Sequence, residues 1–149
     1  MAQTTDGMAF VAAEVFVSPD NAAWTEMSGH GASISVSGGE RAVGEQQTMD
    51  GDTPIIKAGK RSKIEVTCNY VYTEEAAQPF EVLRAIHETV GGLIYLQYAP
   101  KDSDGFWFKS GAAILHKPGY PGGDAGSPDV LLSEFVISCT ALTKAAASD

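Results

Sequence analysis

The sequence of 149 residues has no long hydrophobic run, few cations and only two cysteines. No apolar stretch reaches the roughly 18 residues of a membrane-spanning helix, so no transmembrane segment is predicted. The first ten residues contain no Lys or Arg, so no secretory signal is predicted. The net charge is −9. This balance argues against a nucleic-acid binder, which needs cations, but suits a surface that DNA passes without adhering.

The residue patterns of common active sites and metal sites are also missing. His30, His87 and His116 lie in different predicted elements, and none has a partner at the spacing of a metal ligand set. There is no nucleophile elbow and no local Cys-His pair. The acidic pair Glu74 and Glu75 precedes a predicted helix, where negative charge is stabilising. We therefore expect no enzyme activity, no cofactor and no metal.

The two cysteines, Cys68 and Cys139, fall on the apolar faces of two predicted strands. Cysteines at such positions are typical of buried free thiols in a reducing compartment. A disulfide is the alternative, and it requires the two strands to face each other.

Alternation of apolar and polar residues predicts mostly antiparallel strands. It is nearly ideal in 62–72, where Ile64, Val66, Cys68 and Tyr70 share one face. The predicted fold is mainly β: an antiparallel sandwich or barrel-like double sheet in a single domain, residues 1–149, with one flanking helix. About seven strands are expected, over 8–17, 24–27, 32–37, 62–72, 93–99, 106–116 (with a possible bulge at Gly111) and 129–141.

One helix is predicted over 79–90, because its apolar residues recur at helical spacing. Pro79 suits the first helical position, and Gly91 with Gly92 suits the end. Residues 143–149 are expected to fray.

The segment 38–61 contains five glycines and one proline, and we expect it to be a long irregular loop, or arm. A compact domain seldom carries about 20 irregular residues without a use for them. Its charge is sorted, with acidic residues first and cations after them. We interpret it as an arm that docks on another copy of the protein. The alternative is a mobile surface loop whose charges keep it solvated.

The same region resembles the major tail tube proteins of long-tailed (siphovirus-type) bacteriophages. The resemblance rests on the order of the elements and on a short pattern that leads from the arm into a strand. That pattern consists here of Thr48, Gly51, Pro54, Ile55, Gly59, Lys60 and Arg61, followed by Tyr70, Tyr72 and Thr73.

The resemblance implies a structural virion protein, made in the bacterial cytoplasm. Its hexameric rings would stack into a hollow tail tube through which DNA passes without specific binding. It also implies a tape measure protein and tail terminator or tip proteins as partners. Arm residues expected at the ring–ring contact are Glu45, Thr48, Asp50, Asp52, Pro54, Ile55, Lys57, Lys60 and Arg61. Candidate lumen-facing residues are Glu65, Thr67 and Asn69, or Glu14; the face that lines the lumen stays open.

Two alternatives remain at this point. One is the tube protein of a contractile tail or of a type VI secretion system, which resembles the same fold. The other is a soluble β-sandwich module that binds a carbohydrate or peptide, with Trp107 and Tyr120 as an aromatic platform.

Overall fold

The computed structural model describes most of the chain. Residues 8–12 of the first predicted strand, Val90 of the predicted helix and residues 147–149 of the predicted tail lie outside the described part. The described residues are 13–27, 29, 31–75, 78–89, 91–101, 105–122, 125–126 and 131–146.

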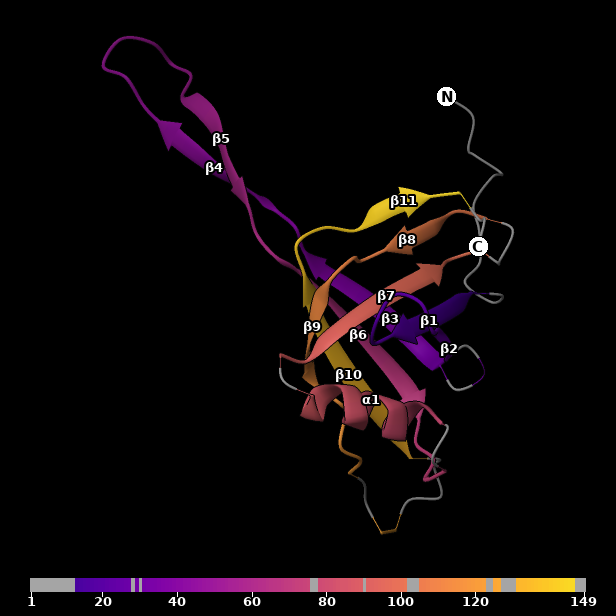
Figure 1. Ribbon diagram of the computed structural model, residues 1–149. Helices are drawn as coiled ribbons and strands as arrows, with labels where there is room; N and C mark the ends of the chain where they lie inside the picture. Colours follow the sequence, from indigo (N-terminus) through magenta and orange to yellow (C-terminus); the bar gives the residue numbers. More distant parts are fainter. Residues whose placement is uncertain are drawn as a thin grey trace, which may run out of the picture.

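Within these residues the chain forms eleven strands and one helix, against the seven strands expected (Figure 1). The elements are β1 (Glu14–Ser18), β2 (Thr25–Glu26), β3 (Gly31–Gly38), β4 (Arg41–Gln46), β5 (Ile55–Arg61), β6 (Ile64–Val71), α1 (Pro79–Glu88), β7 (Leu93–Ala99), β8 (Trp107–Lys109), β9 (Ala113–Lys117), β10 (Leu132–Cys139) and β11 (Thr143–Ala145).

Nine of these strands form one antiparallel sheet that folds over into two layers. One layer contains β3, β6, β10 and β9, and the other contains β2, β1, β7, β8 and β11. Strand β7 joins the layers, because it pairs with β9 at Leu93 and Ile94 and with β1 and β8 further along. The predicted barrel-like double sheet is confirmed.

The predicted strand 106–116 is wrong as a single element. It is two strands, β8 and β9, separated at Ser110, Gly111 and Ala112. Gly111 has a φ of 65°, a left-handed conformation that glycine adopts at no steric cost. The break sends the chain from one layer to the other, so Gly111 marks a corner and not a bulge.

The core lies between the layers, and the alternation predicted for 62–72 is confirmed there. Val66, Cys68 and Tyr70 of β6 are buried opposite Phe135 and Ile137 of β10. The Tyr70 and Phe135 rings pack at a centroid distance of 5.9 Å, and the Tyr70 hydroxyl donates to the Pro118 carbonyl at 2.6 Å. A buried hydroxyl without a hydrogen-bond partner would be costly, so this bond stabilises the packing of the segment around Pro118 against the core.

Helix α1 closes one end of the double sheet. Its apolar stripe, Phe80, Leu83 and Ile86, is buried, as the helical spacing predicts. The helix ends at Glu88, two residues before the predicted end. Its solvent face carries Arg84, which pairs with acidic residues one turn away on either side.

Two predicted irregular segments contain strands. The arm 38–61 is a two-stranded hairpin of β4 and β5. In the tail, Thr143–Ala145 form β11, which pairs with β8 and so is held in the sheet. In both strand pairs, main-chain hydrogen bonds satisfy the backbone groups that face the partner strand.

Cys68 and Cys139 are buried and unbonded, as predicted, so the disulfide alternative does not hold. Burial raises the pKa of the Cys68 thiol to about 12, and it raises the pKa of Cys139 as well. Both thiols are therefore neutral and unreactive at physiological pH.

No helix in the described part of the chain is long and apolar enough to cross a membrane. Among the same residues, no group of three or more His, Cys, Asp or Glu side chains is arranged to hold a metal ion.

Candidate assembly surfaces

The arm hairpin projects away from the double sheet, from the point where β3 ends and β6 begins (Figure 1). Two main-chain bonds fix its root: Gly39 N–H donates to the Lys63 carbonyl at 3.0 Å, and Ser62 N–H donates to the Glu40 carbonyl at 2.8 Å. Beyond the root, the ladder of β4 and β5 connects only these two strands within the described chain. The arm is thus attached to the body at its base alone.

Side chains on both strands of the arm are exposed, and several are apolar. Val43 is 68% exposed, Ile56 63% and Ile55 50%, while Met49 in the turn is fully exposed. Exposed apolar side chains gathered on one projecting element are typical of a surface that another molecule covers.

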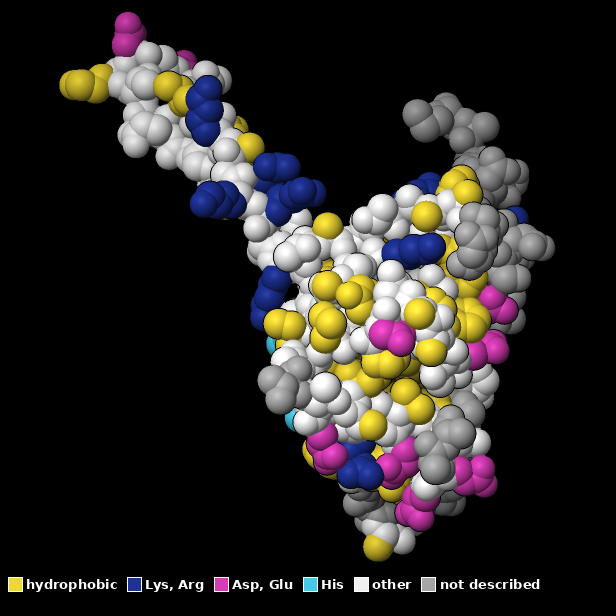
Figure 2. Space-filling model, in the orientation of Figure 1, with side chains coloured by type: hydrophobic (Ala, Val, Ile, Leu, Met, Phe, Trp, Pro, Cys, Tyr) yellow, Lys and Arg dark blue, Asp and Glu magenta, His cyan; other side chains and the backbone are white. Residues whose placement is uncertain are grey.

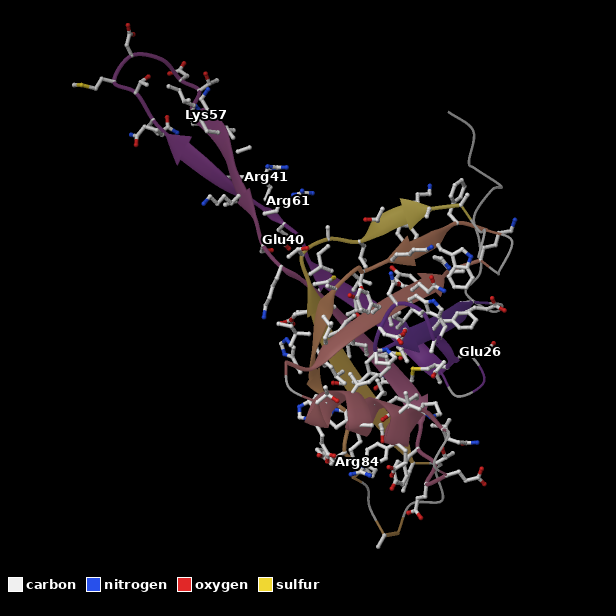
Figure 3. The ribbon with its side chains drawn as sticks, viewed as in Figure 1. Glu26, Glu40, Arg41, Lys57, Arg61 and Arg84 are labelled. Carbon is white, nitrogen blue, oxygen red and sulfur yellow. The ribbon has the colours of Figure 1, made fainter. Side chains whose placement is uncertain are left out.

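The cations of the arm are spread along the hairpin, from Arg41 and Arg61 near the root to Lys57 near the turn (Figure 3). Arg41 and Arg61 lie directly across from each other near the root, and the Arg41 guanidinium donates to the Gly59 carbonyl at 3.2 Å. Asp50 and Asp52 lie in the turn at the far end. We call the part that carries Arg41, Lys57, Lys60 and Arg61 the cationic stem.

The structure brings the predicted arm residues together in one hairpin. Thr48 Oγ1 donates to the Asp50 carbonyl at 3.0 Å and shapes the turn, which Pro54 follows. In the described residues, no ion pair joins the acidic turn to the cationic stem. The remaining predicted arm residues, Glu45, Asp52, Ile55, Lys57, Lys60 and Arg61, are exposed along the hairpin.

Two glycines at the root set the direction of the arm. Gly38 has a φ of 84°, and a Cβ there would lie 2.2 Å from the Lys63 carbonyl oxygen. We expect Gly38→Ala to lower the free energy of unfolding by about 1–3 kcal/mol and to displace the arm. Urea denaturation measures the first effect, and amide hydrogen exchange along 41–61 measures the second. Gly29→Ala is the control, because a Cβ there meets nothing within 4 Å; equal losses for both variants would contradict the steric argument.

The second surface is the outward face of the layer formed by β3, β6, β10 and β9. Registers place Ser33 opposite Asn69, Ser35 opposite Thr67 and Ser37 opposite Glu65. The next strand places Glu134 opposite Asn69 and Ser138 opposite Glu65. We call this set the polar face: Ser33, Ser35, Ser37, Glu65, Thr67, Asn69, Lys117, Glu134 and Ser138.

The polar face is nearly neutral, because its carboxylates are paired. Lys63 Nζ lies 2.9 Å from Glu65 Oε1, and Lys117 Nζ lies 3.7 Å from Glu134 Oε1. The hydrogen bond and charge of Lys63 lower the pKa of Glu65. Asn69 Nδ2 donates to Ser33 Oγ at 3.0 Å. The acidic balance of the chain is therefore not concentrated on this face.

Three of the four candidate lumen residues share the polar face, and the fourth does not. Glu65, Thr67 and Asn69 alternate along β6. Glu14 lies on β1, in the other layer, next to Phe16, whose ring packs on Trp107 at 5.5 Å. The serines of β3 and the partners on β10 were missed. The alternation of ASISVS (32–37) was the available signal, but sequence does not give the neighbour of a strand.

The third surface, the α1 end, was also missed. Its exposed acidic residues are Glu74, Glu75 and Glu88, with Glu81 half-buried. An aromatic row lies beside them: Phe80 packs edge-on against Tyr72 at 4.9 Å and against Tyr120 at 6.1 Å. Burial, followed by the charges of Glu74 and Glu81, raises the pKa of Tyr72.

No protein-family model matches the sequence, and no curated protein sequence matches it. Solved structures do match. A chain in the sheath–tube complex of PVC, an extracellular contractile injection system in the extended state, has a TM-score of 0.65 at 14% identity, covering 97% of this chain and 99% of that chain. A chain in the baseplate of the anti-feeding prophage (AFP) has a TM-score of 0.68 at 10% identity, covering 100% of both.

A chain in the tail of an empty GTA particle gives a similar result, with a TM-score of 0.66 at 11% identity, covering 97% of this chain and 100% of that chain. At these identities the likeness concerns the fold, and it extends over nearly the whole of each molecule. The protein therefore has the antiparallel double-sheet fold of chains found in contractile injection systems and phage-like tails.

Proposed function

We propose that this protein is the tube subunit of a phage-like tail or injection particle. Copies join side by side into rings, and the rings stack into a hollow tube. The observation that carries the proposal is the combination of a polar sheet face with an open edge and a projecting hairpin, on a fold found in such particles.

The open edge is strand β3. It pairs with β6 on one side and is the end of the sheet order within the described chain. An eight-residue edge with free main-chain groups is a template for pairing with another chain. Pairing between copies would extend the polar faces into one continuous wall around a channel.

The wall would act physically and not chemically. It carries a row of short hydroxyl side chains, with Val136 and Ile114 among them, and its two glutamates are paired with lysines. Such a lining offers a passing polyanion neither a cluster of cations to bind nor a strong field to cross. The outward face of the other layer carries Phe16, whose ring packs on Trp107, and among its described residues it lacks the row of serines found on the polar face.

The kind of particle is part of the proposal. Sequence resemblance favours long-tailed phages, whereas several similar structures come from contractile injection systems. We infer the contractile type, with a sheath and a terminator or cap as partners besides other copies of the chain. A tape measure protein and passage of DNA belong to the proposal in the case of a phage tail.

The soluble binding module is the weaker candidate. Its platform required Trp107 and Tyr120 to converge, but Trp107 packs on Phe16 in one layer and Tyr120 packs on Phe80 beside α1. Trp107 is also only 9% exposed, which leaves little ring surface for a sugar or a peptide.

Negative-stain electron microscopy of the purified protein, at low and at high concentration, tests the proposal. We expect hollow tubes, or rings with a central hole, whose number rises with concentration. Compact monomers at every concentration, together with specific capture of a glycan or peptide from an array, would overturn the proposal in favour of the binding module.

A further inference from the structure

Within the described chain, the cations of the cationic stem form no ion pair. Residues 40–61 carry four of the chain's ten cations and four of its 19 acidic residues, two of which, Asp50 and Asp52, lie in the turn. Like charges directly across a strand pair destabilise it, and Arg41 faces Arg61 in this way. Among the described residues, no carboxylate pairs with Arg41, Lys57, Lys60 or Arg61. The four stem cations are therefore available to carboxylates of another copy.

The arm also lacks a core of its own. A two-stranded hairpin is at best marginally stable in water. The side chains of Val43, Ile55 and Ile56 contribute little to it, because they are at least half exposed. A partner for the arm must therefore supply both negative charge and apolar surface.

The α1 end supplies both. Glu74 and Glu75 are exposed and, within the described chain, neither forms an ion pair. Exposed apolar side chains lie beside them: Tyr120 is 67% exposed, and Leu131, whose carbonyl accepts a bond from the Tyr72 N–H, is 45% exposed. The aromatic row from Tyr72 to Tyr120 links the two groups.

The two surfaces lie at opposite ends of the molecule. Figure 2 shows Lys and Arg gathered on the arm, and Asp and Glu gathered around the end that α1 closes. Figure 3 places Arg41 and Arg61 on the projecting hairpin, far from Arg84 of α1. Complementary surfaces at opposite ends cannot satisfy each other within one copy; they meet when copies are arranged head to tail.

We propose that the arm of one copy docks on the α1 end of the next, with the cationic stem against Glu74 and Glu75 and the apolar side chains of the arm against Tyr120 and Leu131. This docking rests on the proposed function and names the surface that receives the arm. It gives the stack a direction, because the cationic stem of one copy is complementary to the α1 end of the next and two α1 ends would bring like charges together. It is also sensitive to salt, since the charges are exposed.

Charge reversal on each side tests the docking. Arg41→Glu with Arg61→Glu reverses the stem, and Glu74→Lys with Glu75→Lys reverses the α1 end. Each double variant should lower the assembled fraction about tenfold or more, because several attractive pairs become repulsive. The variant that carries all four substitutions should recover assembly, because every contact is again between opposite charges. Arg41→Lys with Arg61→Lys keeps the charge and should assemble like the wild type.

Sedimentation and electron microscopy measure assembly, and thermal melts confirm that each variant is folded. If folded double variants assemble like the wild type, or if the four-fold variant does not recover, the docking is wrong while the tube proposal stands. If the wild type forms no tubes, carbodiimide crosslinking of the concentrated protein tests whether the arm of one copy contacts the α1 end of another. Intermolecular links from Lys57 or Lys60 to Glu74 or Glu75 support it without a tube, and their absence overturns it.

Discussion

Replacing Arg41–Arg61 with a short Gly-Ser linker should abolish tube formation and leave the body folded. The strands of the arm pair only with each other within the described chain, and their side chains are exposed, so the core loses no packing. The free energy of unfolding of the body should change by less than about 1 kcal/mol. Urea denaturation measures the stability, and negative-stain microscopy measures assembly.

The matched control keeps the hairpin and removes only the charge of its turn, through Asp50→Asn and Asp52→Asn. This variant should still form tubes, because the proposed docking uses the stem and the apolar side chains. If the linker variant forms tubes of normal length and yield, the arm is not needed for the ring–ring contact. Loss of tubes from the turn variant alone would move the contact from the stem to the acidic turn.

Phe135→Ala should lower the free energy of unfolding by about 3–5 kcal/mol, a large share of the total for a domain of this size. The ring is fully buried, and it packs on Tyr70 in the layer that carries the polar face. Its loss leaves a cavity against the residue whose hydroxyl holds the Pro118 carbonyl. Urea denaturation at low protein concentration, where the chain is monomeric, gives the value.

Ile114→Ala is the control for this substitution, because Ile114 lies on the outward side of β9 and is 57% exposed. Its free energy of unfolding should stay within about 0.5 kcal/mol of the wild type. An equally small loss of unfolding free energy for Phe135→Ala would contradict the prediction. It would mean that the two layers relax to fill the cavity.

Alternation of apolar and polar residues was sufficient to predict strands with one buried face. The helical spacing of apolar residues was sufficient to predict the helix. The core side of β6 and the buried stripe of α1 lie where the sequence placed them. The same pattern did not divide 106–116, since apolar residues resume directly after Gly111 and the interruption is short. Whether a strand continues or changes layer depends on its neighbours, and these are distant in sequence.

The arm shows a different limit. The sequence indicated a long irregular arm over 38–61, and the hairpin of β4 and β5 in it was missed. Strand β4, RAVGEQ, has no alternation because neither face is buried. Such a strand is defined by main-chain pairing, which leaves no apolar pattern to read. Net charge likewise says nothing about location: the pairing of Lys117 with Glu134 joins two strands that are distant in sequence, so it becomes visible only in the structure.

The connection between β8 and β9 at Gly111, where the chain passes from one layer to the other, has a mechanical consequence. In a sandwich of two separate sheets, shear between the layers is resisted only by packed side chains, which can slide. Here β7 pairs with strands of both layers, and the covalent chain from β8 to β9 crosses between them. A load on one layer is therefore carried to the other by hydrogen-bonded ladders and peptide bonds, so the double sheet resists shear. In the tube that we propose, this resistance would keep the channel open while the surrounding structure changes shape.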